Sequence, residues 1–156
     1  MTETLLRVEN LHTYFFNEIG VAKAVDSVSF TIERGEVLGL VGESGCGKSI
    51  TARSIIRLIP SPPGKIINGK IMYAGSDVLK MSNKQIRSIR GNKIAMIFQE
   101  PMTSLNPVFT IGNQIQEAIM LHQNLSIKEA HSKTEEMLFQ VGIASPKKRY
   151  SDYPHQ

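Results

Sequence analysis

The stretch Gly42-Glu-Ser-Gly-Cys-Gly47-Lys48-Ser49 decides the fold of this chain. It matches the motif G-x-x-x-x-G-K-[ST], whose glycines let consecutive backbone N–H groups point inward at phosphate oxygens. An apolar run, Val37-Leu-Gly-Leu-Val41, precedes it and a helical pattern follows it, which is the setting that the motif requires. These residues predict a phosphate-binding loop in an α/β protein.

The motif assigns a role to each residue of this loop. Lys48 is expected to reach the β- and γ-phosphates of a nucleotide, and the Ser49 hydroxyl to take one position around Mg²⁺. Cys46 is either a thiolate favoured by Lys48 and the helix end, or an inert small filler. The remaining residues expected to line the phosphates are Gly42, Ser44, Gly45, Gly47 and Ile50.

Length and composition limit the other classes of protein. The chain has 156 residues, of which 41% are hydrophobic and 21% charged, so it is expected to fold as one soluble domain. No apolar run approaches the roughly 18 to 20 residues of a membrane span, and no signal peptide is recognised at the start. A single cysteine excludes an intrachain disulfide and a cysteine zinc site, so we expect a cytosolic protein. A net charge of +4 is consistent with an anionic ligand and equally with ordinary surface solvation. With 6% aromatic residues and no tryptophan, the chain has few side chains that could stack on the bases of a nucleic acid.

Short apolar patterns predict the elements around the loop. Residues 5–8 and 21–32 alternate with period two, which is typical of half-buried strands. Residues 37–41 and 93–98 are apolar on both faces and predict buried central strands. A helix is expected over residues 49–58, ended by Pro60-Ser-Pro-Pro-Gly64, and residues 64–75 predict two short strands or one bent strand.

The second half of the chain reads as helical. Ser82-Asn-Lys-Gln85 and Ser126-Ile-Lys-Glu129 have capping-box spacing and each should begin a helix. Residues 99–107 predict an exposed loop, and a helix should follow through residues 111–122. Lys147-Lys148-Arg149 is interpreted as a solvated loop.

Several segments together resemble the ATP-binding cassette subunits of ABC transporters, in the branch that serves oligopeptide, dipeptide and nickel importers. The resemblance covers essentially the whole chain and rests on these segments: Ala24-Val-Asp-Ser-Val-Ser-Phe30, Gly39-Leu-Val-Gly-Glu-Ser-Gly-Cys-Gly-Lys-Ser49, Ile94-Ala-Met-Ile-Phe-Gln-Glu-Pro-Met-Thr-Ser-Leu-Asn-Pro107 and Tyr153-Pro-His-Gln156.

The resemblance implies a P-loop NTPase (RecA-like) core with an N-terminal antiparallel β portion and the start of a helical subdomain. The β portion would comprise residues 5–35 and 64–75, the core residues 36–60 and 93–99, and the helical subdomain residues 107–156. The chain would thus be the N-terminal part of one nucleotide-binding domain, 1–156, of a longer protein.

The resemblance also implies ligands and partners. ATP and Mg²⁺ would be the cofactors, Phe15 or its neighbour Tyr14 would stack on adenine, and Gln99 would complete the Mg²⁺ shell and act in catalysis with Lys48. The expected activity is ATP hydrolysis that powers peptide import, with a nickel importer as an alternative. The partners would be transmembrane permease subunits contacted through the region around Gln99, a second ATPase subunit and, indirectly, an extracytoplasmic substrate-binding protein. The location would be peripheral, on the cytoplasmic face of the membrane.

The sequence departs from the family at two points. Ile50 replaces a common threonine, so one side-chain hydroxyl near the phosphates is lost. The Leu-Ser-Gly-Gly signature, the Walker B aspartate, the catalytic glutamate and the switch histidine do not occur within the 156 residues. We therefore expect these residues alone to bind nucleotide weakly without turnover, and to expose an apolar face and an unpaired sheet edge.

Other interpretations receive less support from the residues. A small P-loop kinase would need an arginine-rich lid and has no use for the segment around Gln99. Glu100 and Asp77 are the carboxylates considered as a base for water, but a loop or docking role suits Glu100 better. The four histidines have no ligand spacing.

Overall fold

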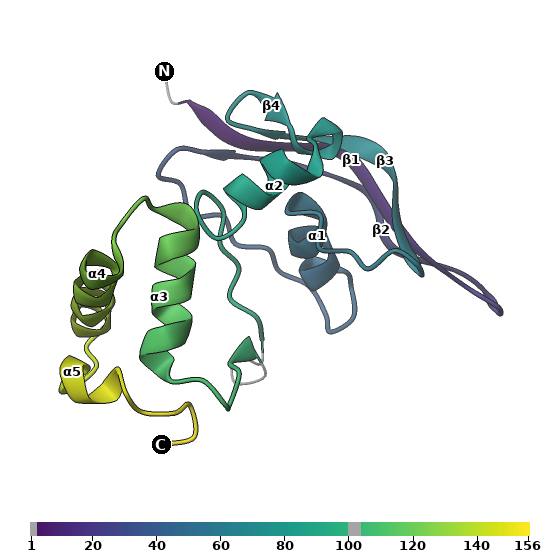
Figure 1. The fold of residues 1–156 in the computed structure, drawn as a ribbon. Helices are drawn as coiled ribbons and strands as arrows, with labels where there is room; N and C mark the ends of the chain where they lie inside the picture. Colours follow the sequence, from purple (N-terminus) through teal and green to yellow (C-terminus); the bar gives the residue numbers. More distant parts are fainter. Residues whose placement is uncertain (1–2, 100–103) are drawn as a thin grey trace. The chain divides into compact units, whose positions relative to one another are not determined.

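The computed structural model describes residues 3–99 and 104–156. The chain divides into two compact units, Met1–Arg90 and Gly91–Gln156, which are described separately below (Figure 1). Glu100 lies outside the described residues, so the structure does not bear on its predicted role. Within the described ranges, no helix has the length and apolar character needed to cross a bilayer.

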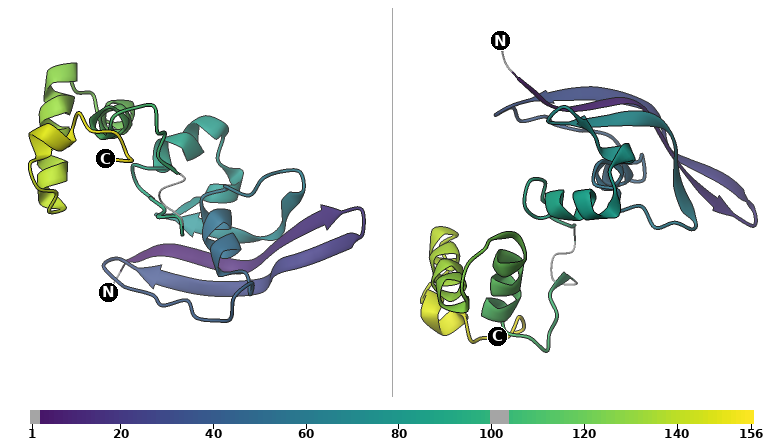
Figure 2. Two further views of the ribbon diagram at one scale, coloured as in Figure 1. Left: turned by 90° about the horizontal axis from the view of Figure 1, so that it is seen from below. Right: turned by 45° about the horizontal axis from the view of Figure 1, so that its top comes forward.

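The first unit is built on an antiparallel sheet in the order β2-β1-β3-β4 (Figure 2). Its strands are β1 (Thr4–Asn17), β2 (Gly20–Glu33), β3 (Gly64–Tyr73) and the short β4 (Ser76–Asp77). The predicted antiparallel β portion is confirmed. For residues 64–75 two short strands or one bent strand were expected, and the single strand β3 is observed, followed by the short β4. β1 runs well past residue 8 because Leu11 and Thr13 continue its buried positions after an irregularity in the ladder.

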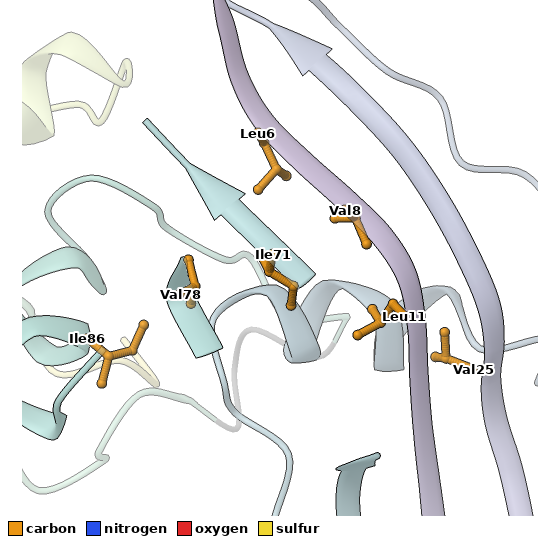
Figure 3. Packing of buried hydrophobic residues seen from close by; sticks show 7 residues of the cluster. All are labelled: Leu6, Val8, Leu11, Val25, Ile71, Val78 and Ile86. Atoms are coloured by element: carbon orange, nitrogen blue, oxygen red, sulfur yellow. The ribbon is translucent and has the colours of Figure 1, made fainter. Parts of the chain in front are cut away.

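A single apolar core lies on one face of this sheet, which we call the inner face. Buried side chains alternate along β1, as a strand with one covered face requires. The cluster draws on all the strands except β4 and on two helical elements, and Figure 3 shows its members: Leu6, Val8, Leu11, Val25, Ile71, Val78 and Ile86.

Three helical elements cover the inner face: α1 (Lys48–Ile55), the 3-10 helix η1 (Val78–Lys80) and α2 (Asn83–Ile89) (Figure 1). The capping box predicted at Ser82 and Gln85 is confirmed at the start of α2. α1 ends three residues before the predicted residue 58. Arg57 adopts a left-handed conformation (φ 52°), and the Leu58 N–H bonds the Arg53 carbonyl at 2.8 Å, so the chain closes in a Schellman-type turn.

Two predicted strands are wrong. Residues 37–41 and 93–98 form no strand, and the side chains of Val37, Val41 and Ile97 are 95%, 91% and 91% exposed. A run that is apolar on both faces becomes a central strand only when neighbouring strands bond both of its edges. Among the described residues no strand is paired with either run.

The second unit is helical, with α3 (Ile111–His122), α4 (Ile127–Gln140) and α5 (Pro146–Arg149). The predicted helices are confirmed, including the capping box at Ser126 and Glu129. α5 corrects the loop expected at residues 147–149, since Pro146 occupies the first turn, where its fixed φ favours a helix. The Tyr150 ring lies against Gly112, where a Cβ atom would come within 2.3 Å of it. The chain end is thereby packed on α3.

Candidate functional site

The loop before α1 has a backbone that only glycine suits at its last position. Gly42, Gly45 and Gly47 all have positive φ, and Gly47 has φ 94° as the residue that precedes α1. A Cβ atom on Gly47 would lie 2.1 Å from the Ala24 carbonyl oxygen of β2. Any other residue here must displace the strand, so the close approach of loop and sheet depends on this glycine.

The N-terminus of α1 presents its backbone amides without a side-chain cap. Gly47 provides no capping hydrogen bond, and the first turn contains no acidic side chain. The first N–H groups of a helix have no partner within the helix and carry the positive end of its dipole. This end of α1 is therefore suited to an anion such as a phosphate.

Lys48 extends across the loop rather than away from it. Its ammonium donates to the Gly42 and Glu43 carbonyls, both at 2.7 Å, and lies 3.4 Å from the Cys46 Sγ. Ser49, at the start of α1, is exposed, as is the Cys46 thiol. A cation, a row of amides and a hydroxyl thus gather at one loop, and these groups fit the phosphates of a nucleotide and its Mg²⁺.

The two aromatic candidates for the base differ in their surroundings. The Tyr14 hydroxyl donates to the Asp26 carboxylate at 2.7 Å, and the Lys23 ammonium lies 5.4 Å from its ring centroid. This hydrogen bond to Asp26 raises the pKa of Tyr14. The half-buried Phe15 instead packs toward Gly64 of β3, where an added Cβ would lie 2.9 Å from the ring. The Phe15 side chain has no polar atom, so no hydrogen bond of its own competes with a stacked base.

Gln99 and Asp77 are the other predicted residues that the structure describes. Gln99 is exposed and belongs to the second unit, so its contact with the Mg²⁺ shell stays a prediction. The Asp77 carboxylate accepts the Leu79 N–H at 3.1 Å and caps η1. That contact gives Asp77 a structural role.

The sequence analysis missed the contacts of three residues around the loop and α1: Thr13, Ala24 and Ser54. Thr13 and Ser54 are fully buried, and their hydroxyl oxygens lie 2.9 Å apart between β1 and α1. Thr13 occupies a buried position in the period-two pattern of β1, where an apolar residue is expected, and that polar exception was the available signal. Ala24 begins one of the segments that carry the resemblance, but its contact with Gly47 could not be predicted, because it is made by the backbone carbonyl.

Comparison with known proteins identifies the family. The family model described as ABC transporter matches residues 25–156. The chain is 49% identical over 154 residues to the probable peptide ABC transporter ATP-binding protein y4tR of Sinorhizobium fredii, covering 99% of this chain and 46% of that protein. It is 46% identical to the dipeptide transport ATP-binding protein DppD of Bacillus subtilis, again over 99% of this chain and 46% of the relative. The chain therefore spans about half the length of these curated relatives.

A solved structure supports the fold independently. The dimeric ATP-binding cassette MJ0796, in a post-hydrolysis state bound to ADP and Pi, matches with a TM-score of 0.83 at 20% identity. The match covers 97% of this chain and 62% of that one. At this identity the likeness establishes a P-loop cassette fold and nothing about ligands.

Proposed function

The chain belongs to the ABC transporter family, and from this premise we propose that it is the nucleotide-binding part of an ATPase subunit that powers peptide import. The observation that carries nucleotide binding is the loop itself. Gly47 approaches β2 as only glycine can, and the Lys48 ammonium lies over the loop carbonyls. The names of the similar proteins, which include peptide and dipeptide transport, support peptides as the cargo.

In this proposal each part of the site has one task. The Lys48 ammonium pairs with the β- and γ-phosphates, and Phe15 stacks on the adenine. When bound, Mg²⁺ neutralises phosphate charge, and Ser49 and Gln99 are the residues proposed to hold it. The phosphate oxygens accept hydrogen bonds from backbone N–H groups of the loop and of the first turn of α1. The residues proposed to line the phosphates in this way are Gly42, Ser44, Gly45, Cys46, Gly47 and Ile50.

The proposed setting is an assembly at the cytoplasmic face of the membrane. Permease subunits would be contacted through the region around Gln99, and a second ATPase subunit would complete the pair. A binding protein outside the membrane would deliver the peptide indirectly. The ABC transporter family of the chain supports this arrangement.

Lys48→Ala tests the proposed binding of ATP. The expected result is a loss of Mg-ATP affinity of about 10- to 100-fold, because no other side chain of the loop supplies a charge-assisted contact. The measurement is equilibrium titration with a fluorescent ATP analogue. Lys84→Ala, at an exposed position of α2, is the matched control and should bind like the unmodified chain. Equal affinities in all three proteins would refute the proposed site.

We also propose that these 156 residues bind nucleotide without turning it over. Hydrolysis needs a group that orients the attacking water, and the signature, the Walker B aspartate and the catalytic glutamate are not among these residues. Phosphate release from the purified chain should equal that of the Lys48→Ala variant. Turnover that depends on Lys48 would contradict the proposal and make Glu100 the first carboxylate to substitute.

A further inference from the structure

Two buried hydroxyl groups join the sheet to the helix that follows the phosphate loop. Thr13 of β1 and Ser54 of α1 are both 0% exposed, and their Oγ atoms are 2.9 Å apart. Ser54 donates its own proton to the Ile50 carbonyl at 2.7 Å, so Thr13 is the donor to Ser54. The other buried side chains of β1 are Leu6, Val8 and Leu11, all apolar. This contact is thus the single buried polar link along β1.

The ladder between β1 and β2 is irregular at the same place. Thr13 lies opposite Val25 and Tyr14 opposite Lys23, so Ala24 is an extra residue on β2. The ladder between β1 and β3 also shifts, between His12 and Thr13. A bulge bends a strand and re-aims its side chains, and bulges are frequent beside functional sites.

Two residues at this irregularity contact α1 near its two ends. The Ala24 carbonyl lies against Gly47, the residue that precedes the helix, at the position where a Cβ would be 2.1 Å away. Thr13 holds Ser54, which lies in the last turn. The aromatic residues Tyr14 and Phe15 follow Thr13 directly in the chain. One irregular point of the sheet therefore fixes both the phosphate loop and the strand that carries the aromatic candidates.

We propose that Thr13 and Ser54 are positioning residues, which set the span between the phosphate loop and the aromatic side chain that stacks on the base. The inference rests on the proposed function, because it assumes that ATP binds across this span. A valine and an alanine would fill the same space, and replacing both partners of a hydrogen bond by apolar groups is often nearly neutral for stability. The directional contact is therefore better explained by the alignment it imposes than by the stability it adds.

The test compares two ligands that use different parts of the site. Mg-ATP must reach both the loop and the aromatic residue, whereas inorganic tripolyphosphate with Mg²⁺ needs the loop alone. Isothermal titration calorimetry on the 156-residue chain gives both affinities. Thr13→Val and Ser54→Ala should each weaken ATP about 3- to 10-fold and change tripolyphosphate affinity less than about 2-fold. Together the two substitutions should cost little more than either alone, because they remove one shared contact.

Two further variants separate alignment from general damage. Thr13→Ser keeps the hydroxyl and should restore ATP affinity to within about 2-fold of the unmodified chain. Thr134→Val is the matched control, since Thr134 is also 0% exposed and its Oγ1 donates to the Ala130 carbonyl at 2.8 Å in α4 of the second unit. It should leave both affinities unchanged.

Each outcome decides the inference. Equal losses for ATP and tripolyphosphate would reduce Thr13 and Ser54 to supports of the fold, and unchanged ATP affinity in Thr13→Val and Ser54→Ala would overturn their role outright. In both cases ATP binding by the unmodified chain would leave the proposed function standing. If the unmodified chain binds no ATP, the proposed function fails, and the inference fails with it. Should Thr13→Val not fold, as judged by circular dichroism, Ser54→Ala and Thr13→Ser still decide between these outcomes.

Discussion

The strand β2 and the connecting segment, residues 34–47, follow one another in the chain but differ in strand pairing and in the burial of their apolar side chains. β2 bonds β1 along its length and places Val25 in the core with 3% exposure. The connecting segment contains the wholly apolar run Val37-Leu-Gly-Leu-Val41, yet Val41 is 91% exposed. The difference teaches that apolar character predicts burial only where hydrogen-bonding neighbours are present for the backbone as well.

The largest expected contrast is in stability. Leu11→Ala, at a fully buried position of the core, should lower the free energy of unfolding of the first unit by about 2 to 5 kcal/mol. Val41→Ala in the connecting segment should change it by less than about 0.5 kcal/mol, because the side chain is already in solvent. Urea unfolding followed by circular dichroism compares the two, and similar losses would show that the run at residues 37–41 is buried in solution.

A second contrast lies within the phosphate loop, where the connecting segment meets the sheet. Gly47→Ala should abolish detectable ATP binding, since its Cβ would collide with the Ala24 carbonyl at 2.1 Å. A Cβ added at Gly45 would have no atom within 4 Å, so Gly45→Ala is disfavoured only by the positive φ of 82°. A loss of ATP affinity of about 5- to 30-fold is therefore expected. Titration with a fluorescent ATP analogue ranks the two variants. Equal losses of ATP affinity would mean that the close contact of the loop with β2 is not needed for binding.

A smaller effect distinguishes the helical unit, where caps rather than strand partners fix the elements. Ser126→Ala removes half of the capping box of α4 and should destabilise the second unit by about 1 kcal/mol. Two hydrogen bonds from Ser126 lower the pKa of Glu129: the larger effect comes from the Ser126 side chain and the smaller from its backbone N–H. Because the folded pKa is depressed, this part of the cap's contribution is present above the ordinary pKa of 4.5 and is lost as the pH falls through the folded value. The difference between the two proteins in urea should therefore shrink in acid, and a difference that grows in acid would contradict the assignment.

The smallest effect concerns the thiol in the loop. Cys46 is exposed and is the single cysteine, so a maleimide should modify it, and bound Mg-ATP should slow the labelling about 3-fold or more. Mass spectrometry of samples labelled with and without ATP measures the rates. Identical rates at saturating ATP would place the thiol away from the nucleotide.

Local rules predicted the elements whose signals are local. Period two predicted strands at residues 5–8 and 21–32, which lie within β1 and β2, and both capping boxes were found where Ser and Gln or Glu stand three apart. The end of α1 escaped prediction because Arg57 adopts a left-handed conformation, which is rare for residues other than glycine and asparagine. The runs at residues 37–41 and 93–98 failed because their pattern carries no information about which strands pair with them.

In the candidate site, too, only the features with a local sequence signal could be predicted. The motif located the loop and the helix after it, because spacing along the chain is what the motif records. The contacts that join this part of the chain to the sheet come from distant positions: the Ala24 carbonyl lies against Gly47, and the Thr13 hydroxyl bonds Ser54 in the last turn of α1. Neither has a signature that links it to Gly47 or Ser54 in the sequence.

The tip of the β1–β2 hairpin gives the first unit a convenient second labelling point. The Asn17 side chain accepts the N–H groups of Ile19 and Gly20 at 3.1 and 2.9 Å, which closes the turn while Ile19 stays 98% exposed. Ile19→Cys would therefore give the chain a second accessible thiol, besides that of Cys46, without changing the core. A pair of spin labels at these two positions would report the distance between the phosphate loop and the tip of the hairpin, so pulsed dipolar spectroscopy can follow the loop against the sheet directly.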